Sequence, residues 1–198
     1  NPDARFFEAN IANFDEISRI FKEEKPEYVL HLAAIPRMPV SISDPVGTTR
    51  ANVVGTVSVF KAAADNGVKR VVFASSSSVY GDQPVLPLKE DMKPMPISPY
   101  GLQKLQGEEF AVLFTSLYKL PVVSLRYFNV YGPRIDVGSE YSLVLGKFLR
   151  LHKEGKPLPI TGDGNQTRAF CYVSDVVNAS PSDPLDGASL GPLTDFKY

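Results

Sequence analysis

Tyr100 and Lys104 stand four residues apart in the stretch Ser98-Pro99-Tyr100-Gly101-Leu102-Gln103-Lys104. Residues at positions i and i+4 share one face of a helix, so a phenol and an ammonium would point into the same space. A free phenol has a pKa of about 10 and is a poor base at neutral pH, but a nearby cation stabilises the phenolate and lowers that pKa. The pair could therefore move a proton on and off an alcohol or sugar hydroxyl. The spacing alone is weak evidence, because Tyr-x-x-x-Lys also occurs by chance on many helices.

Ser98 and Pro99 predict where the helix that carries this pair begins. Serine is a favoured N-cap residue, because its hydroxyl can accept a bond from a backbone N–H of the first turn. Proline is tolerated at the first helical position, where its missing N–H costs nothing. We expect this helix to run to about Tyr118.

Strands and helices alternate along the rest of the chain. Near-continuous apolar runs predict strands buried on both faces, and apolar residues at helical spacing predict helices between them. We expect strands over 28–34, 71–75 and 122–127, a short strand over 4–11, helices over 15–24, 49–66 and 141–155, and loops over 35–48, 81–98 and 161–168. This order is typical of an α/β fold with a doubly wound parallel sheet.

Three stretches lie at the ends of predicted strands, at 31–34, 75–78 and 127–129. In open α/β sheets, ligands bind beyond the carboxyl ends of the parallel strands. We therefore expect these three stretches to lie near one another and Tyr100 to join them from the start of its helix.

Composition excludes several classes of function. The 198 residues carry a net charge of −1, with 43% hydrophobic and 22% charged residues, so nothing indicates a nucleic-acid or membrane-surface partner. One cysteine and two histidines exclude a disulfide framework and argue against a zinc site, and we expect no metal. No apolar run approaches the ~20 residues that span a bilayer, and the polar N-terminus shows no signal peptide. We expect a cytoplasmic protein.

Several other residue types in the sequence are expected to be structural. His31 is expected to be a partly buried strand histidine with a satisfied hydrogen bond, and Tyr80 a packing residue. Cys171 is expected in the core. Glu108 and Glu109 are expected on the solvated face of their helix.

Six motifs occur in an order that resembles the extended short-chain dehydrogenase/reductase family, and within it the NAD-dependent nucleotide-sugar 4-epimerases. They are His31-Leu-Ala-Ala34, Ser41 with Pro45, Asn52-Val-Val-Gly-Thr56, Ser75-Ser-Ser-Ser-Val-Tyr-Gly81, Tyr100-x-x-x-Lys104 and Arg126-Tyr-Phe-Asn-Val-Tyr-Gly-Pro-Arg134. The resemblance implies a partial Rossmann-like NAD-binding domain over 1–132, a partial substrate-binding region over 133–178 and an irregular tail over 179–198. No Gly-rich turn follows a strand in this sequence, so we expect these 198 residues alone to bind NAD weakly.

The resemblance also implies roles for individual residues. Tyr100 is similar to the family's catalytic base, Lys104 to its partner on the NAD ribose, and Ser76 to the hydroxyl that hydrogen-bonds the reacting sugar oxygen. The expected cofactor contacts are Asn10, Ile11, Leu32, Ala33, Ala34, Ser75, Tyr100, Lys104, Tyr127 and Phe128. The expected substrate contacts are Ser76, Ser77, Asn129 and Arg168.

The activity implied is epimerisation of a UDP-hexose or UDP-N-acetylhexosamine at C4 through a transient 4-keto sugar. Ser77 and Ser78 stand where the dehydratase branch has Asp-Glu, which favours epimerisation over removal of water. A sugar-nucleotide reductase, a decarboxylase or a non-catalytic truncated relative stay open as alternatives. By analogy alone, the helices at 49–66 and 101–118 are expected to form a homodimer interface.

Overall fold

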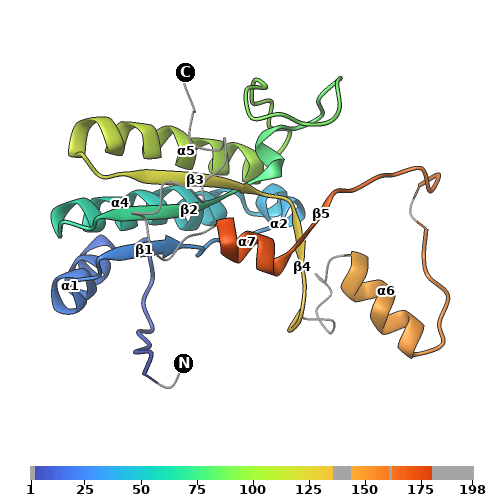
Figure 1. Ribbon diagram of the computed structural model, residues 1–198, viewed down its shortest axis with the longest axis horizontal. Coiled ribbons are helices and arrows are strands. Elements are labelled where there is room, and N and C mark those ends of the chain that lie inside the picture. The colour runs from blue at the N-terminus through green and yellow to red at the C-terminus, as the bar shows by residue number, and fades with distance from the viewer. Residues whose placement is uncertain (1–2, 136–143, 161, 180–198) are drawn as a thin grey trace. The chain divides into compact units, whose positions relative to one another are not determined.

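The computed structural model describes residues 3–135, 144–160 and 162–179, and the chain divides into two compact units. The described part of the first unit ends at Arg126, and the second unit begins at Tyr127 (Figure 1). The domain boundary expected at 132–133 stays a prediction. None of the helices in the described part of the chain has the length and apolar character that crossing a bilayer requires.

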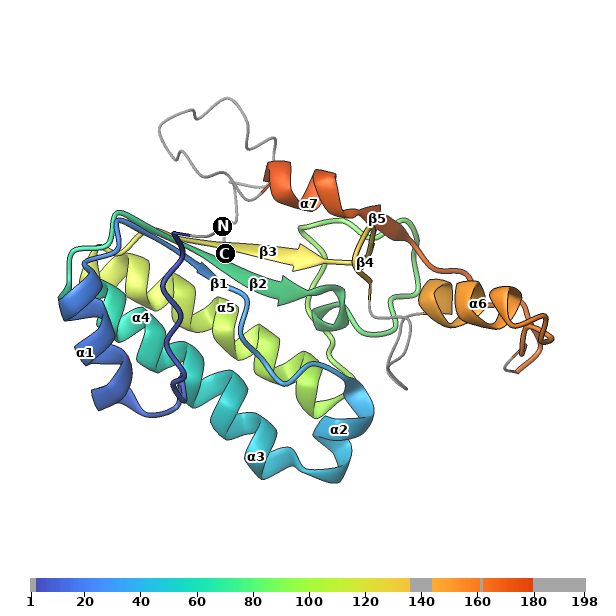
Figure 2. The same cartoon turned by 90° about the horizontal axis from the view of Figure 1, so that it is seen from below.

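A three-stranded sheet in the order β1-β2-β3 forms the base of the first unit. Its strands are β1 (Tyr28–His31), β2 (Arg70–Ser76) and β3 (Val122–Tyr127). β1 pairs with β2 in parallel, with His31 opposite Phe73, and the three arrows point the same way in Figure 2. Parallel neighbours need a crossover, and helices supply both crossovers here. The expected parallel α/β architecture is confirmed.

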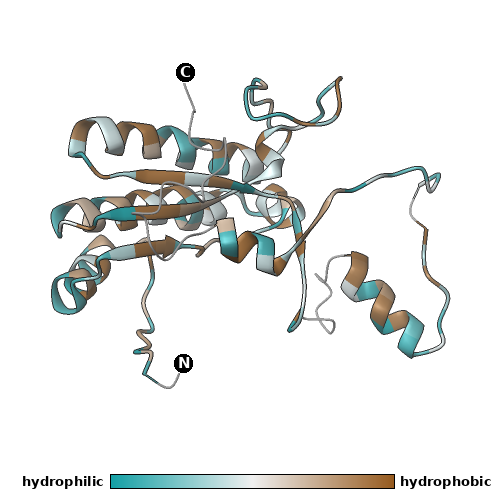
Figure 3. Ribbon diagram, viewed as in Figure 1, coloured by the Kyte–Doolittle hydropathy of each residue, from teal (hydrophilic) through white to brown (hydrophobic). Residues whose placement is uncertain are grey.

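Three helices cover one face of this sheet (Figure 2). They are α1 (Phe14–Glu24), α4 (Gly55–Asp65) and α5 (Pro99–Tyr118). The core between helices and sheet contains Ile17, Phe21, Val59, Phe60, Ala62, Ala63, Val68, Val71, Phe73, Ala111, Phe114 and Leu120. Phe60 lies at its centre, edge-on to Phe73 and Phe114 with ring centroids 5.8 and 5.6 Å away. Figure 3 shows apolar and polar residues on all three helices. α5 carries exposed apolar residues in addition to those that it contributes to the core.

Two short helices occupy the segment that was expected to be a loop over 35–48. α2 (Met38–Ser43) and α3 (Pro45–Thr49) each have a proline in their first turn. The Pro-rich composition suggested a loop, but proline at those positions is compatible with a helix. A π-helical turn, η1 (Arg50–Val54), joins α3 to α4, so the helix expected over 49–66 begins earlier and changes winding part-way.

The prediction of a strand over 4–11 is wrong. Residues 4–10 belong to no regular element, and Phe6 is 89% exposed. An extended segment becomes a strand only when its backbone pairs with a neighbour, and this described stretch has no ladder partner. The helix expected over 15–24 is confirmed, and Asn13 caps its first turn by accepting a bond from the Glu16 N–H.

The described part of the second unit contains a parallel pair of short strands and two helices. The strands are β4 (Asn129–Tyr131) and β5 (Phe170–Tyr172), and the helices are α6 (Val144–Lys153) and α7 (Val173–Ala179). The helix expected over 141–155 is present from Val144, and residues 141–143 lie outside the described residues. Of the expected tail over 179–198, Ala179 ends α7 and the rest lies outside the described residues.

Candidate active site

The start of α5 is held by two serine hydroxyls. Ser98 caps the helix, its hydroxyl accepting from the Gly101 N–H at 3.1 Å. The Tyr100 N–H donates to the hydroxyl of Ser41 at 3.0 Å, and Ser41 is fully buried. The first N–H groups of a helix have no partner within it, so these two bonds fix where Tyr100 enters the site.

Two glycines let α5 approach the sheet closely. A Cβ on Gly101 would lie 2.6 Å from the carbonyl oxygen of Ser78. A Cβ on Gly107 would lie 2.4 Å from Cζ of Phe73 in β2. The helix therefore packs against the end of β2 and the 3₁₀ turn that follows it, η2 (Ser77–Val79), where a side chain would hold it away.

Tyr100, Ser76 and Lys104 meet at the carboxyl end of β2. The side chain of Ser76 interacts with the Tyr100 phenol and favours its charged form. The Ser76 hydroxyl also donates to the hydroxyl of Ser78 and accepts from the Ser78 N–H, both at 3.2 Å. The Lys104 ammonium lies 5.9 Å from the centroid of the Tyr100 ring and donates to the carbonyl oxygen of Ala74 at 2.7 Å. Lys104 is 4% exposed, whereas Tyr100 and Ser76 are half-buried and remain accessible. The structure thus places the three candidate catalytic residues together, and their catalytic roles stay a prediction.

The pKa of Tyr100 departs from the sequence-based expectation. Burial raises the pKa of the phenol, and the hydrogen bond with Ser76 lowers it by a smaller amount. The pKa of Tyr100 is therefore raised and not lowered as expected, because burial outweighs the effect that favours the phenolate. Burial also lowers the pKa of Lys104, from 10.5 to about 8.

Glu108 is buried, and the expectation that it lies on a solvated face is wrong. Its side chain is 4% exposed and forms an ion pair with Arg126 of β3, Oε2 to Nη2 at 2.7 Å. Oε1 accepts from Arg126 Nε at 2.9 Å and from the Ser75 hydroxyl at 2.5 Å. Glu109 is exposed, as expected. The signal was available in the spacing, since Glu108 follows Lys104 by four residues and shares its face.

Asn52 and Gln103 are positioning residues that sequence reasoning missed. Asn52, in the π-helical turn, is 2% exposed and bonds both backbone groups of Ile35, accepting from its N–H at 2.8 Å and donating to its carbonyl at 3.0 Å. It also donates to Oε1 of Gln103 at 2.8 Å. Because Ile35 follows the strand-end residues of β1 and Gln103 precedes Lys104, this contact ties the end of β1 to α5.

The expected cofactor contacts of the first unit lie at several places around the sheet. Leu32 is 59% exposed and Ala33 is exposed directly after β1, while Ala34 is half-buried. Asn10 is exposed before α1, and the side chain of Ile11 lies against Gly55 of α4. Leu32 and Ala33 therefore leave surface open at the end of β1, whereas the hydroxyl of Ser75 already bonds Glu108.

Four of the expected contacts lie in the second unit. Tyr127 and Phe128 are half-buried. Asn129 pairs with Phe170 in the β4–β5 ladder, and its Nδ2 donates to the carbonyl of Ala169 at 2.8 Å. Arg168 is exposed just before Ala169. Two expected substrate contacts thus lie in or just before the β4–β5 strand pair, Asn129 in β4 and Arg168 two residues before β5. Ser77 begins η2 in the first unit and is half-buried.

His31 is the buried strand histidine that was expected. It is 3% exposed, and its Nε2 lies 3.0 Å from the hydroxyl of Thr56. That hydroxyl donates its own proton to the carbonyl of Asn52 at 2.6 Å, so Nε2 of His31 must carry the proton that Thr56 accepts. Burial, and then the charge of Lys104, lower the pKa of His31 from 6.5 to about 4. His31 is therefore neutral at physiological pH.

Comparison with known proteins assigns the family. A model of the NAD dependent epimerase/dehydratase family matches residues 1–180. The chain belongs to this family. A UDP-glucose 4-epimerase of Mycolicibacterium smegmatis is 40% identical, aligned over 88% of this chain and 55% of that protein. A UDP-glucuronate 4-epimerase of Thermodesulfobacterium geofontis is 34% identical, aligned over 96% of this chain and 55% of that protein.

Solved structures of epimerases have the same fold. A UDP-glucose 4-epimerase of Thermotoga maritima, solved with UDP-glucose, matches with a TM-score of 0.86 and 37% identity, over 90% of this chain and 58% of that one. A UDP-N-acetylglucosamine 4-epimerase of Methanobrevibacter ruminantium, in complex with UDP-N-acetylmuramic acid, matches with a TM-score of 0.83 and 38% identity. The chain spans a little over half the length of these epimerases.

Proposed function

We propose that the protein containing this chain is an NAD-dependent epimerase that inverts C4 of a UDP-hexose or UDP-N-acetylhexosamine through a transient 4-keto sugar. The observation that carries the proposal is the meeting of Tyr100, Ser76 and Lys104 at the carboxyl end of β2. An accessible phenol beside a serine hydroxyl and an ammonium is suited to removing and returning the proton of a sugar hydroxyl. The family and the UDP-sugar epimerases similar to this chain support the choice of substrate class.

Each residue has a separate task in this reaction. Tyr100 takes the proton of the 4-hydroxyl as the ketone forms and returns it when the alcohol is restored. Ser76, already hydrogen-bonded to Tyr100, bonds the same sugar oxygen and stabilises the charge that develops there, which is worth a few kcal/mol in a preorganised site. Asn129 and Arg168, which lie at the β4–β5 pair, bind the diphosphate of the substrate.

The residues at the end of β1 fit a dinucleotide. Leu32 and Ala33 offer exposed apolar and small surface that a flat ring can cover. Lys104, on α5 beside the neighbouring strand β2, would bind a ribose hydroxyl. Asn10, Ile11, Ala34, Tyr127 and Phe128 are the further contacts that we propose for the cofactor. A bound NAD would supply the hydride acceptor and donor for C4, together with a positive ring that favours the Tyr100 phenolate.

Exposed apolar residues on α5 support a homodimer. Leu102, Leu113 and Leu117 are 48%, 50% and 71% exposed on a helix whose other face is in the core. A second copy of this helix would cover them. We therefore propose a homodimer, which size-exclusion chromatography with light scattering would distinguish from a monomer.

The test of the proposed function uses the full-length protein that contains this chain. It is incubated with NAD and either UDP-glucose or UDP-galactose, or with their N-acetylated counterparts, and the products are resolved by chromatography. An epimerase converts each C4 isomer into the other and leaves the NADH absorbance at its starting level. Parallel incubations test the alternatives: net consumption of added NAD(P)H would identify a reductase, and release of carbon dioxide from an added UDP-uronic acid would identify a decarboxylase. No reaction with any of these substrates would indicate a non-catalytic relative.

A further inference from the structure

Three successive residues at the end of β2 bind side chains of α5. The carbonyl of Ala74 accepts from Lys104, and the hydroxyl of Ser75 donates to Glu108. The side chain of Ser76 interacts with Tyr100, and its hydroxyl also bonds the hydroxyl and the N–H of Ser78, both at 3.2 Å. The three α5 residues follow one another at spacings of four, so all three contacts come from one face of the helix.

Arg126 fixes the carboxylate at the centre of this arrangement. Its guanidinium donates two hydrogen bonds to Glu108, from Nε to Oε1 at 2.9 Å and from Nη2 to Oε2 at 2.7 Å. The side chains of Arg126 and Glu108 are almost completely buried, at 7% and 4% exposure. A bidentate pair of this kind leaves the carboxylate little freedom to rotate. The oxygen that accepts from Ser75 is therefore held in place from β3.

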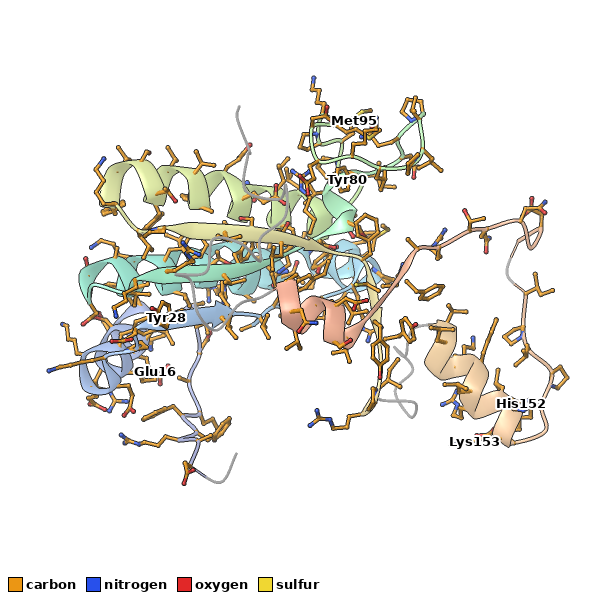
Figure 4. The ribbon with its side chains drawn as sticks, in the orientation of Figure 1. Glu16, Tyr28, Tyr80, Met95, His152 and Lys153 are labelled. Atoms are coloured by element: carbon orange, nitrogen blue, oxygen red, sulfur yellow. The ribbon has the colours of Figure 1, made fainter. Side chains whose placement is uncertain are left out.

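The same guanidinium contacts the segment that joins Ser76 to Tyr100. It lies 4.6 Å from the ring centroid of Tyr80, and its Nη1 donates to the carbonyl of Glu90 at 3.5 Å. The N–H of Met95 in this segment donates to the carbonyl of Val79 at 3.1 Å, and Figure 4 shows Tyr80 and Met95 close together at the base of this loop. One buried cation thus stabilises both the strand end and the chain that returns to α5.

We infer that Glu108, held by Arg126, is a positioning residue for the reaction: through the Ser75 hydroxyl it orients the Ser75–Ser76 backbone and keeps the Ser76 hydroxyl directed at Tyr100. The inference rests on the proposed epimerase function. Glu108 itself touches neither Tyr100 nor Ser76 through a hydrogen bond among those of the described residues, so its effect on the reacting pair passes through Ser75.

Ser75→Ala in the full-length protein is the sharpest test, because it removes one hydroxyl and leaves the ion pair intact. We expect kcat for C4 epimerisation to fall about tenfold, with KM for the UDP-sugar and for NAD unchanged within about twofold. Ser75→Thr keeps a hydroxyl and should restore most of the rate. Ser116→Ala, which removes a hydroxyl from the solvent-exposed end of α5, is the matched control and should match the wild type.

Two kinetic outcomes overturn the inference. A Ser75→Ala enzyme with wild-type kcat would show that Ser76 needs no support from Glu108. A rise in KM for NAD with kcat preserved would make Ser75 a cofactor contact and not a positioning residue. Loss of thermal stability with kcat unchanged would likewise show that the contacts among Arg126, Glu108 and Ser75 are only structural.

Crystal structures of the wild type and of Ser75→Ala test the inference even if no turnover is detected. We expect the Ser76–Tyr100 hydrogen bond in the wild type and its loss or lengthening in the variant. An inactive wild type with this structural change would refute the proposed function and support the positioning contact. An active wild type whose variant keeps the Ser76–Tyr100 bond would leave the function standing and overturn the inference.

Discussion

Protonation of His31 should destabilise the first unit in mild acid. The pKa of His31 is lowered from 6.5 to about 4, because the ring is buried beside Phe60 and Phe73 and because Lys104 is nearby. The unfolded chain therefore binds a proton between these two values that the folded chain does not, and the free energy of unfolding decreases as the pH falls from 6.5 to about 4. At ~1.4 kcal/mol for each unit of pKa, the full loss is about 3 kcal/mol.

The assay is urea unfolding of the full-length protein, followed by circular dichroism at a series of pH values across this window. His31→Gln can still donate to the hydroxyl of Thr56 but does not titrate. Between pH 6.5 and about 4, its free energy of unfolding should therefore decrease by about 3 kcal/mol less than that of the wild type. His152→Gln, an exposed histidine of α6, is the control and should keep the acid sensitivity of the wild type because His31 remains. If acid lowered the free energy of unfolding by the same amount in the wild type and in His31→Gln, the assignment of His31 as a neutral buried group would be refuted.

Three further predictions concern the free energy of unfolding of the full-length protein in urea. Burial lowers the pKa of Lys104 from 10.5 to about 8, so the unfolded chain binds the extra proton between these values and stability should rise with pH from about 8 to about 10.5. Lys104→Met should remove this increase in the free energy of unfolding. If the variant showed the same increase between about pH 8 and 10.5, another group would be its cause. Gly107→Ala should lower the free energy of unfolding by about 1–3 kcal/mol, because the new Cβ would lie 2.4 Å from the Phe73 ring. An increase of about 1 kcal/mol, as expected from helix propensity, would show instead that the ring moves freely. Asn52→Leu should cost about 3 kcal/mol, because both backbone groups of Ile35 lose a buried partner, and a cost under ~1 kcal/mol would mean that water replaces the amide.

The elements of the first unit were predictable where the signal is local. Ser98 and Pro99 predict the start of α5, and the apolar run of β2 predicts a buried strand, because capping and burial leave direct traces in the residue types. The meeting of Tyr100 and Ser76 was also predictable, since it needs only the rule that parallel strands end at one edge. Residue spacing and that rule were sufficient for this part of the site.

The remainder of the site depends on contacts between distant residues. The spacing places Glu108 on the same face of α5 as Lys104, but its partner Arg126 comes from β3, which no local pattern identifies. The direction of the pKa change at Tyr100 depends on how much of the ring is covered, which the Tyr-x-x-x-Lys spacing does not contain. The π-helical turn that directs Asn52 at Ile35 likewise has no signature in the apolar pattern of its helix.

The steady-state rate of the Tyr100→Phe variant is the most direct test of the central claim. The full-length protein and the variant are compared with UDP-galactose and NAD, and near-ultraviolet circular dichroism confirms that both are folded alike. Because phenylalanine keeps the ring and lacks the hydroxyl that exchanges the proton, kcat should fall by about three orders of magnitude, within the range attributed to general acid–base catalysis. Epimerisation at the wild-type rate by a correctly folded Tyr100→Phe protein would contradict the account.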